Sequence, residues 1–411
     1  MQPKLTVIVP TIERPDTLYW TLKTVTSQDY GNFSIIVSDN ASTDNTAEVV
    51  AAFNDPRITY INPGKRLSMA RHWEFALAHV KEGYVSILGD DDGLLPGALS
   101  HAAMLLNKYK VPAIGWRFGN YNWPGLSPHF MVPMGNYYRL VNAREEVARV
   151  FNTQNIVSTI QFPSLYGGFI SIDVINGLKE KFGGQFYHSR IPDFFSGGAV
   201  AATVDQYLRL HYPLSLNATS KHSTGYATIN SAIDQKAIND LQSNSDNIPF
   251  HPQLVFSKTI NMAIAEAMLQ VHEKVPGFPK LSIEKIITET AQEVASTESD
   301  LKYRETMDTL LEIGRRNNLL PFAESTVAAN PHQPLLNIPV KHKYSPVSET
   351  IYLDTTGLKI NNVFDACNVA ASMQLGTRFE LKGALQQYVS KVQQGLRYLY
   401  LKANVFPKLK G

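Results

Sequence analysis

The first 121 residues alternate between short apolar runs and longer segments with helical spacing, and this alternation constrains the fold most strongly. The apolar, β-branched runs typical of buried strands occupy residues 4–10, 33–40, 58–63, 83–92 and 112–121. The helical segments between them occupy residues 14–28, 42–53, 68–80 and 96–109. This spacing predicts βαβ units, and therefore an α/β domain with a mainly parallel sheet flanked by helices. Ligands bind such sheets at the carboxyl ends of the strands, so polar residues at those ends are the first candidates for a site.

The second half of the chain has a different character. Residues 223–255 are polar and irregular, which is typical of a connection between domains. Beyond them, residues 256–275 and 282–318 show helical periodicity. A chain of 411 residues exceeds one average domain. We therefore expect an α/β domain over residues 1–222, a connecting segment over residues 223–255, and a mostly helical C-terminal domain over residues 256–411.

Composition narrows the class of protein. A formal net charge of +2 argues against nucleic acid as the main partner, because duplex binders carry a marked basic excess. The single cysteine, Cys367, rules out an intrachain disulfide framework and suits a reducing compartment. The sequence has neither a secretory leader pattern nor a run of about 18 apolar residues that would cross a membrane. We expect a cytoplasmic protein.

Three consecutive carboxylates, Asp90, Asp91 and Asp92, stand at the end of the strand predicted over residues 83–92. They repel one another at neutral pH, and a divalent cation would offset that repulsion. Mg²⁺ and Mn²⁺ prefer carboxylate oxygens and often bind through one or two carboxylates together with substrate phosphates. The alternative is an acidic surface turn at Asp92–Gly93. The position behind a buried strand favours a metal site, at which the cation would bridge a diphosphate leaving group.

Another carboxylate, Asp39, ends the second predicted strand. It can accept the N3–H of uracil or thymine, a donor that cytosine lacks. The alternative is an Asx-type cap on the following helix, which neighbouring polar residues could supply equally well. Pro10 and Thr11 end the first strand and are predicted to line the same nucleoside pocket, unless they only terminate the strand.

Taken together, these motifs resemble the family 2 glycosyltransferases of the GT-A fold, in particular bacterial members that build surface polysaccharides. Four motifs carry the resemblance, in the family's order and spacing: "TVIVPTIERPDTL", "IIVSDNASTDNT", "GYVSILGDDDGLLPGAL" and "IPDF". It covers about residues 4–220 and does not extend to residues 250–411. In that family the first two motifs hold the nucleoside, an Asp-x-Asp motif holds the metal and diphosphate, and a downstream Asp is the catalytic base.

The resemblance implies a role for each matching residue. The expected nucleoside contacts are Pro10, Thr11, Glu13 and Asp39. The acidic triplet would form the metal and ribose site, although the commoner family pattern places its first acidic residue at Gly89. Either Asp90 and Asp92 form the motif, or Asp91 and Asp92 do. Asp92 belongs to both registers and is therefore the predicted metal ligand.

Three further positions match the family. Asp193, just before a helical segment, stands in the place of the catalytic carboxylate, which would deprotonate the acceptor hydroxyl. Alternatively Asp193 caps that helix, and Asp205 is a weaker candidate base. Arg71 matches a basic position and would meet a phosphate, and His222 falls where some relatives supply another metal or phosphate contact. A solvated surface residue is the alternative for both.

The implied activity is that of an inverting, metal-dependent glycosyltransferase using Mn²⁺ or Mg²⁺. It would move a sugar from a nucleotide donor, UDP-linked if Asp39 reads uracil, to a hydroxyl of a glycan or lipid-linked glycan. A sugar-nucleotide pyrophosphorylase would need a glycine-rich phosphate loop after the first strand, and "PTIERPDT" contains no glycine. A non-catalytic sugar- or nucleotide-binding module is disfavoured by the presence of Asp92 and Asp193. The aromatic segment with Trp116, Tyr121 and Trp123 is either a sugar-stacking surface or, as the alternative, a strand with core aromatics.

The end of the chain is basic and apolar. Residues 381–411 contain six Lys or Arg and no Asp or Glu, interleaved with Leu, Val and Tyr. This pattern suits a helix that lies on an anionic membrane surface, in this case the inner face of the membrane. The alternative is a helix packed on its own protein or on a second subunit of a homo-oligomer.

Overall fold

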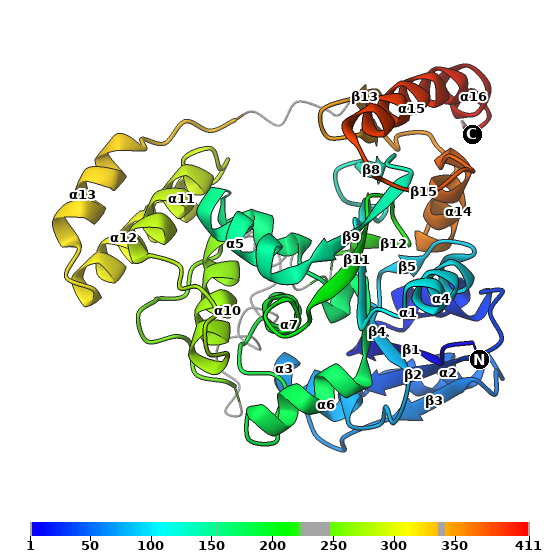
Figure 1. The fold of residues 1–411 in the computed structure, drawn as a ribbon, viewed down its shortest axis with the longest axis horizontal. Helices are drawn as coiled ribbons and strands as arrows, with labels where there is room; N and C mark the ends of the chain where they lie inside the picture. Colours follow the sequence, from blue (N-terminus) through cyan, green and yellow to red (C-terminus); the bar gives the residue numbers. More distant parts are fainter. Residues whose placement is uncertain (1, 154, 222, 224–246, 336–341, 410–411) are drawn as a thin grey trace.

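The computed structural model describes residues 2–153, 155–221, 223, 247–335 and 342–409 (Figure 1). At one end of its larger sheet four parallel strands lie in the order β4-β1-β2-β3, with β3 as the edge strand. Their bounds are β1 (Leu5–Thr11), β2 (Phe33–Asp39), β3 (Ile58–Ile61) and β4 (Tyr84–Ile87). The predicted parallel α/β core is confirmed. Because Thr11 pairs with Asp39, β1 and β2 end side by side.

The four-stranded core continues into a mixed sheet of nine strands. The added strands, in order from β4, are β10 (Gly168–Ser171), β6 (Ala113–Trp116), β11 (Gln206–Leu210), β9 (Tyr137–Asn142) and β15 (Phe379–Glu380). β10 runs antiparallel to both of its neighbours, β4 and β6. The strands β1, β2 and β4 are thus parallel, so their carboxyl ends lie at the same side of the sheet. The predicted site residues of the sequence motifs follow these ends.

Helices cover both faces of the sheet. The helices of the first half are α1 (Pro15–Thr26), α2 (Thr46–Ala51), α3 (Met69–Leu77), α4 (Ala98–Tyr109), α5 (Ala143–Thr153), α6 (Ile172–Lys181) and α7 (Pro192–Ala201). In β1, Ile8 belongs to one hydrophobic cluster with Trp73 of α3, whereas Val7 and Val9 belong to another with Leu22 of α1. Successive side chains of a strand point to opposite faces, and in β1 both faces are buried, which explains the uninterrupted apolar run.

A second sheet of six strands stands beside the first and has the order β13-β14-β8-β7-β12-β5. Its strands are β5 (Gly93–Leu94), β7 (Gly119–Asn122), β8 (Phe130–Pro133), β12 (Ser215–Thr219), β13 (Lys343–Ser345) and β14 (Thr350–Leu353). β14 pairs antiparallel with β8. The helix α14 (Val363–Met373) packs on this sheet, and α15 (Ala384–Asn404) and α16 (Phe406–Leu409) end the described chain.

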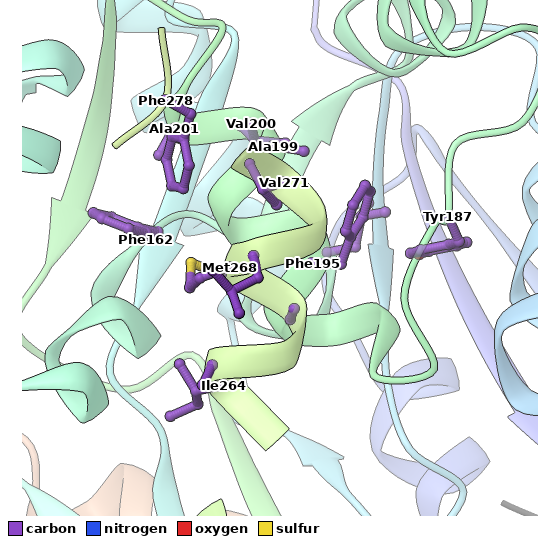
Figure 2. Packing of buried hydrophobic residues seen from close by; sticks show 14 of the residues in the cluster. Phe162, Tyr187, Phe195, Ala199, Val200, Ala201, Ile264, Met268, Val271 and Phe278 are labelled. Atoms are coloured by element: carbon purple, nitrogen blue, oxygen red, sulfur yellow. The ribbon is translucent and has the colours of Figure 1, made fainter. Parts of the chain in front are cut away.

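The remaining helices project to one side of the sheets in Figure 1. They are α10 (Ile260–Lys274), α11 (Ile283–Ala295), α12 (Asp300–Arg316) and α13 (Leu320–Ala329). Figure 2 shows Ile264, Met268 and Val271 of α10 beside the apolar residues of α7. A Cβ at Gly198 of α7 would lie 2.8 Å from Met268 Cε, so the glycine permits this close approach.

The C-terminal region is mostly helical, as expected, but it is not a single helical unit. Helices α10–α13 share their hydrophobic cluster with α7, whereas residues 343–409 return to the two sheets of the first half and add β13, β14 and β15 to them. The single domain expected over residues 256–411 is therefore better described as two parts. Of the connecting segment expected over residues 223–255, only residues 223 and 247–255 are described. Among the described residues, no helix combines the length and apolar character needed to cross a bilayer.

Candidate active site

A cavity of about 600 Å³ opens at the carboxyl ends of β1 and β4 and is closed on the far side by α7 and α10. Its size is in the range of small-molecule sites. It lies where a parallel sheet is expected to bind ligands. The lining includes Pro10, Thr11, Asp90 and Asp91 from the strand ends and Asp193 from the first turn of α7.

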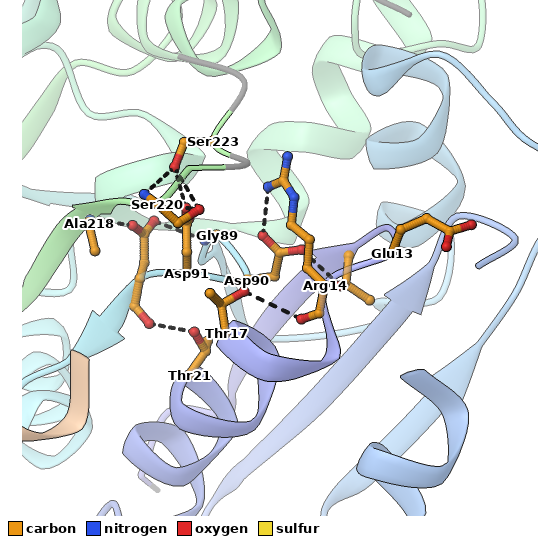
Figure 3. A network of polar contacts seen from close by, with 12 residues as sticks. Glu13, Arg14, Thr17, Thr21, Gly89, Asp90, Asp91, Ala218, Ser220 and Ser223 are labelled. Carbon is orange, nitrogen blue, oxygen red and sulfur yellow. Dashed lines mark hydrogen bonds and ion pairs between the residues drawn. The ribbon is translucent and has the colours of Figure 1, made fainter. Parts of the chain in front are cut away.

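The three carboxylates of the acidic triplet point in different directions. Asp90 faces the cavity, where its Oδ1 accepts a hydrogen bond from Arg14 Nη1 at 3.0 Å and its Oδ2 accepts one from Thr11 Oγ1 at 2.8 Å (Figure 3). Burial raises the pKa of the Asp90 carboxyl, and the Arg14 guanidinium acts in the opposite direction. Asp90 thus already has one positive partner in the protein.

Asp91 lines the same cavity. Its Oδ2 accepts hydrogen bonds from Ser220 Oγ, at 2.8 Å, and from Ser223 Oγ. Its backbone carbonyl accepts one from Trp123 Nε1 at 2.9 Å. No described residue donates to its Oδ1, so this oxygen is available to a ligand.

The aromatic segment with Trp116, Tyr121 and Trp123 is part of the protein interior. Trp123 supports the acidic loop through its bond to the Asp91 carbonyl, and Trp116 and Tyr121 are buried. The sugar-stacking interpretation of this segment is therefore wrong, and the core alternative holds.

Asp92 turns away from the cavity. Its Oδ1 accepts a hydrogen bond from the Ala218 amide at 2.7 Å, and its Oδ2 accepts from the Gly89 amide at 3.1 Å and from the Tyr166 hydroxyl. The residue is 2% exposed. Burial, and then the charge of Asp91, raise the pKa of the Asp92 carboxyl well above its usual range. This placement disfavours Asp92 as the metal ligand and favours Asp91, with Asp90 beside it.

Gly89 explains why the usual register of the motif is shifted. A Cβ at this position would lie 2.6 Å from Asp92 Oδ2, so the inward carboxyl of Asp92 occupies the space of a side chain there. A side chain at this position, where the commoner family pattern has an acidic residue, would therefore have to displace the Asp92 carboxyl from its hydrogen bond to the Gly89 amide. The pair of carboxylates that faces the cavity is Asp90 and Asp91.

Asp39 is buried beside the cavity and does not line it. Its Oδ1 accepts from the Ser42 amide at 3.0 Å and from the Ser42 hydroxyl, and its Oδ2 accepts from Tyr60 Oη at 2.5 Å and Asn62 Nδ2 at 3.3 Å. Burial, and then the bond to Asp39, raise the pKa of Tyr60 to about 12, so the phenol remains a donor. The contacts to Ser42 fix the loop before α2, whose N-cap is Asn45, so Asp39 does not form the helix cap that was its alternative role.

The positive charge at the cavity comes from residues that the motifs did not identify. Arg14 and Arg66 line the cavity, whereas Arg71 reaches outward to Gln185. Glu13 lies at the rim, where its Oε1 accepts from Arg66 Nη2 at 3.0 Å. A signal for Arg14 was present in the sequence, because an arginine directly after the first strand precedes the Pro15 that begins α1.

Asp193 lies in the first turn of α7 and lines the same cavity as Asp90 and Asp91. Burial raises the pKa of the Asp193 carboxyl to about 6. Its weaker rival, Asp205, is exposed at the start of β11 and is not part of the cavity lining. His222 lies outside the described residues.

Aromatic residues complete the cavity, and periodicity alone did not separate them from core residues. Tyr166 and Trp73 line it with their rings stacked 6.1 Å apart, and Phe250 and Phe256 line it from the segment before α10. Burial lowers the pKa of His72 to about 4, so the imidazole in this wall is neutral. Among these cavity residues, only Trp73 gave a signal in the sequence, because it is an aromatic residue inside the helical segment "ARHWEFAL".

Residues 6–158 match the family model described as Glycosyl transferase family 2. Over these residues the chain is similar to the family 2 glycosyltransferases. The resemblance predicted from the motifs is confirmed over these residues, and the parallel core with its acidic loop after β4 agrees with the GT-A fold expected of the family.

Curated relatives match the family 2 domain rather than the whole chain. A GalNAc(5)-diNAcBac-PP-undecaprenol beta-1,3-glucosyltransferase of Campylobacter jejuni is 40% identical over 101 residues, 24% of this chain and 33% of the relative. The putative colanic acid biosynthesis glycosyl transferase WcaA of Escherichia coli is 27% identical over 170 residues, 39% of this chain and 56% of the relative. The chain thus spans between a third and just over half of the length of these relatives.

Another relative from Escherichia coli is the UDP-Glc:alpha-D-GlcNAc-diphosphoundecaprenol beta-1,3-glucosyltransferase WfaP. It is 29% identical over 107 residues, 26% of this chain and 43% of the relative. Among solved structures, S. aureus TarS 1–349 in complex with UDP-GlcNAc is similar with a TM-score of 0.49 and 13% identity, over 80% of this chain and 89% of that one.

Proposed function

We propose that this protein transfers a sugar from a nucleotide-sugar donor to a hydroxyl of a glycan acceptor, with inversion at the anomeric carbon. The observation that carries the proposal is one cavity lined by three carboxylates, Asp90 and Asp91 from the acidic loop and Asp193 from the first turn of α7. The family match over residues 6–158 supports glycosyl transfer as the chemistry. The printed names of two relatives contain a UDP-sugar donor or an undecaprenol-linked acceptor, and we extend both substrate classes to this chain.

The acidic loop suits a hard divalent cation, Mn²⁺ or Mg²⁺. Within the described residues, no three His, Cys, Asp or Glu side chains come together as a metal-binding cluster. A closed protein cage is not needed, because such ions often bind one or two carboxylates and take their other ligands from water and substrate phosphates. Asp91 would hold the ion through its free Oδ1, with Asp90 beside it. When bound, the ion supplies charge stabilisation to the departing nucleoside diphosphate.

Arg66 and Asp193 supply what the acidic loop lacks. Arg66 is a second guanidinium in the cavity wall and suits the diphosphate, because guanidinium groups bind phosphate oxygens with paired hydrogen bonds. Asp193, with a pKa of about 6, is mostly ionised at neutral pH and can accept a proton. The acceptor oxygen forms a bond to the anomeric carbon, the bond from that carbon to the diphosphate breaks, and the hydroxyl proton passes to Asp193. Attack from the face opposite the leaving group inverts the configuration.

The two ends of the cavity suit different parts of the substrates. On the β1 side, the Asn40 side chain makes two hydrogen bonds with the backbone of Leu67. Its Nδ2 donates to the Leu67 carbonyl at 2.8 Å, and its Oδ1 accepts from the Leu67 amide at 2.9 Å. These bonds fix the loop that would hold the nucleoside. On the α10 side, Phe250 and Phe256 offer aromatic rings on which acceptor sugars can pack. The helical part of the chain therefore contributes to the proposed acceptor side.

A donor screen tests the proposed function. The full chain is incubated with UDP-, GDP- and CDP-sugars and Mn²⁺, and release of nucleoside diphosphate is measured with and without a short undecaprenol-type glycan acceptor. We expect release of UDP that the acceptor accelerates. Binding of UDP-sugars without turnover would identify a binding module instead, and formation of UTP from UDP-sugar and pyrophosphate would identify a pyrophosphorylase.

Recognition of uracil by Asp39 is a separate part of the proposal. It requires the Tyr60 hydroxyl to give up its hydrogen bond to Asp39 Oδ2, so that this oxygen can accept the uracil N3–H. The variant Asp39→Asn retains an oxygen for the Ser42 amide but offers an amide donor where the uracil N3–H needs an acceptor. Losing this bond should weaken UDP binding by about ten- to a hundredfold and improve CDP binding. Titration calorimetry of both nucleotides against parent and variant checks this, with Tyr60→Phe as a control that should not weaken UDP. Equal UDP and CDP affinities in the parent would refute base reading.

A further inference from the structure

Helix α15 turns its polar side toward the protein and its apolar side toward solvent. Six of its large apolar residues are 47–76% exposed. They are Leu385, Tyr388, Val392, Leu396, Leu399 and Tyr400. With 3.6 residues per turn, these side chains fall within an arc of about 120° and form one continuous surface along the helix, which we call the apolar stripe. A helix that only covered its own protein would bury this side.

Specific hydrogen bonds fix the rotation of α15. Ser390 and Gln394, on the side opposite the apolar stripe, are fully buried. Ser390 Oγ donates to Asn136 Oδ1 at 2.6 Å, Gln394 Nε2 donates to Glu349 Oε2 at 3.1 Å, and Gln394 Oε1 accepts from Tyr344 Oη at 2.9 Å. Turning the stripe inward would leave these buried polar groups without partners, which is costly. The exposure of the stripe is therefore built into the tertiary structure.

Positive charges border the apolar stripe on both sides. By the same helical spacing, Lys391 and Lys402 stand about 100–120° from its centre on one side, and Arg397 about 120° on the other. Arg397 lies over the ring of Tyr400, with 5.2 Å from Cζ to the ring centroid, and Lys402 is exposed. Residues 381–411 contain no acidic side chain. Long basic side chains beside an apolar face are typical of helices that lie in the interface of an anionic bilayer.

We infer that the apolar stripe of α15 docks on a membrane surface that contains anionic lipids, with the helix lying along that surface. A second copy of this chain fits less well, because pairing two stripes would bring the basic borders of both helices together, and α15 itself contains no acidic residue. Of the border residues, Lys391 lies 3.9 Å from Glu349 of its own chain, whereas Lys402 is exposed. This inference does not depend on the proposed activity, since it rests on α15 alone. Of the two alternatives for the C-terminal segment, this inference selects the membrane surface over packing on the protein itself or on a second subunit.

Vesicle co-sedimentation of the full chain tests the inference. The protein is mixed with vesicles of phosphatidylcholine, with and without about 30 mol% phosphatidylglycerol. We expect binding that needs the anionic lipid and weakens with added salt. The variant Leu396→Asp/Leu399→Asp should lower the partition coefficient by at least about a hundredfold, because two exposed leucines that would enter the bilayer interface are replaced by charges of the wrong sign.

The matched control is Leu301→Asp on α12, a leucine that is 60% exposed outside the apolar stripe. It should bind vesicles like the parent, and all three proteins should keep the same thermal midpoint. Equal vesicle binding by the stripe variant, or no binding by the parent, would overturn the inference. Loss of a dimer by the stripe variant in light scattering, without vesicle binding by the parent, would assign the surface to a second copy.

Discussion

Replacing Asp193 by Asn is expected to lower the rate of sugar transfer by about 10²–10⁴ and to leave donor affinity unchanged. The amide has the shape of the carboxylate but cannot take the acceptor proton, and Asp193 lines the cavity from α7 rather than from the acidic loop that would hold the diphosphate. Single-turnover kinetics measure the rate, and calorimetry with UDP measures the affinity. Asp205→Asn is the control, because this exposed aspartate just before β11 lies outside the cavity lining and its loss should not change the rate.

The pH dependence of the parent enzyme should carry the signature of the same group. Burial raises the pKa of Asp193 to about 6, and the ionised form is the active base. The rate should therefore be constant above about pH 7 and fall about tenfold per pH unit well below about pH 6. An acid limb near about pH 4, the range of an unperturbed carboxyl, would mean that another group is the base. Loss of donor binding in Asp193→Asn would make Asp193 a binding residue instead.

Substituting the two neighbouring aspartates separately should separate metal binding from stability. Asp91→Ala should abolish the increase in UDP affinity that Mn²⁺ produces, because Asp91 offers the free oxygen in the cavity. Asp92→Ala should keep that increase but destabilise the fold, because the amides of Gly89 and Ala218 and the hydroxyl of Tyr166 lose their acceptor. Each buried donor left unpaired costs about 1–3 kcal/mol.

Calorimetry with and without Mn²⁺ and thermal unfolding of both variants are the two measurements. The thermal midpoint should fall clearly further for Asp92→Ala than for Asp91→Ala. Thr21 Oγ1 donates to the backbone carbonyl of Asp92, a bond that both substitutions leave intact. If Asp92→Ala loses the metal effect while Asp91→Ala retains it, Asp92 is the metal ligand and Asp91 is not.

The parallel core was predictable because its signal is local. Strands buried on both faces must be apolar throughout, and their ends must carry the polar residues that face a ligand, as Asp90 and Asp91 do. The direction of each carboxylate was not predictable, since Asp92 is turned inward by Tyr166 and Ala218, which stand 74 and 126 residues later in the chain. A run of three identical residues contains no information on such partners.

The orientation of α15 illustrates the same limit. Its composition predicted a helix with basic and apolar residues, but the side that faces the protein is decided by Ser390 and Gln394. Their partners include Asn136, 254 residues before Ser390 in the chain. Helical periodicity alone would have assigned the apolar side to the interior. The strands β13, β14 and β15 are too short to give a periodic signal and were likewise not predicted.

The return of the C-terminal residues to the two sheets has a consequence for how the chain is made. β14 pairs with β8, and Tyr137 donates a hydrogen bond to Glu349, 212 residues later. During synthesis the N-terminal half therefore leaves the ribosome with the edge of β8 unpaired, and an unpaired edge is open to pairing with other chains. Contacts of such long range also slow folding. Completion of the second sheet must follow translation through Leu353, the last residue of β14, so a product that ends before this residue is exposed to aggregation at this edge.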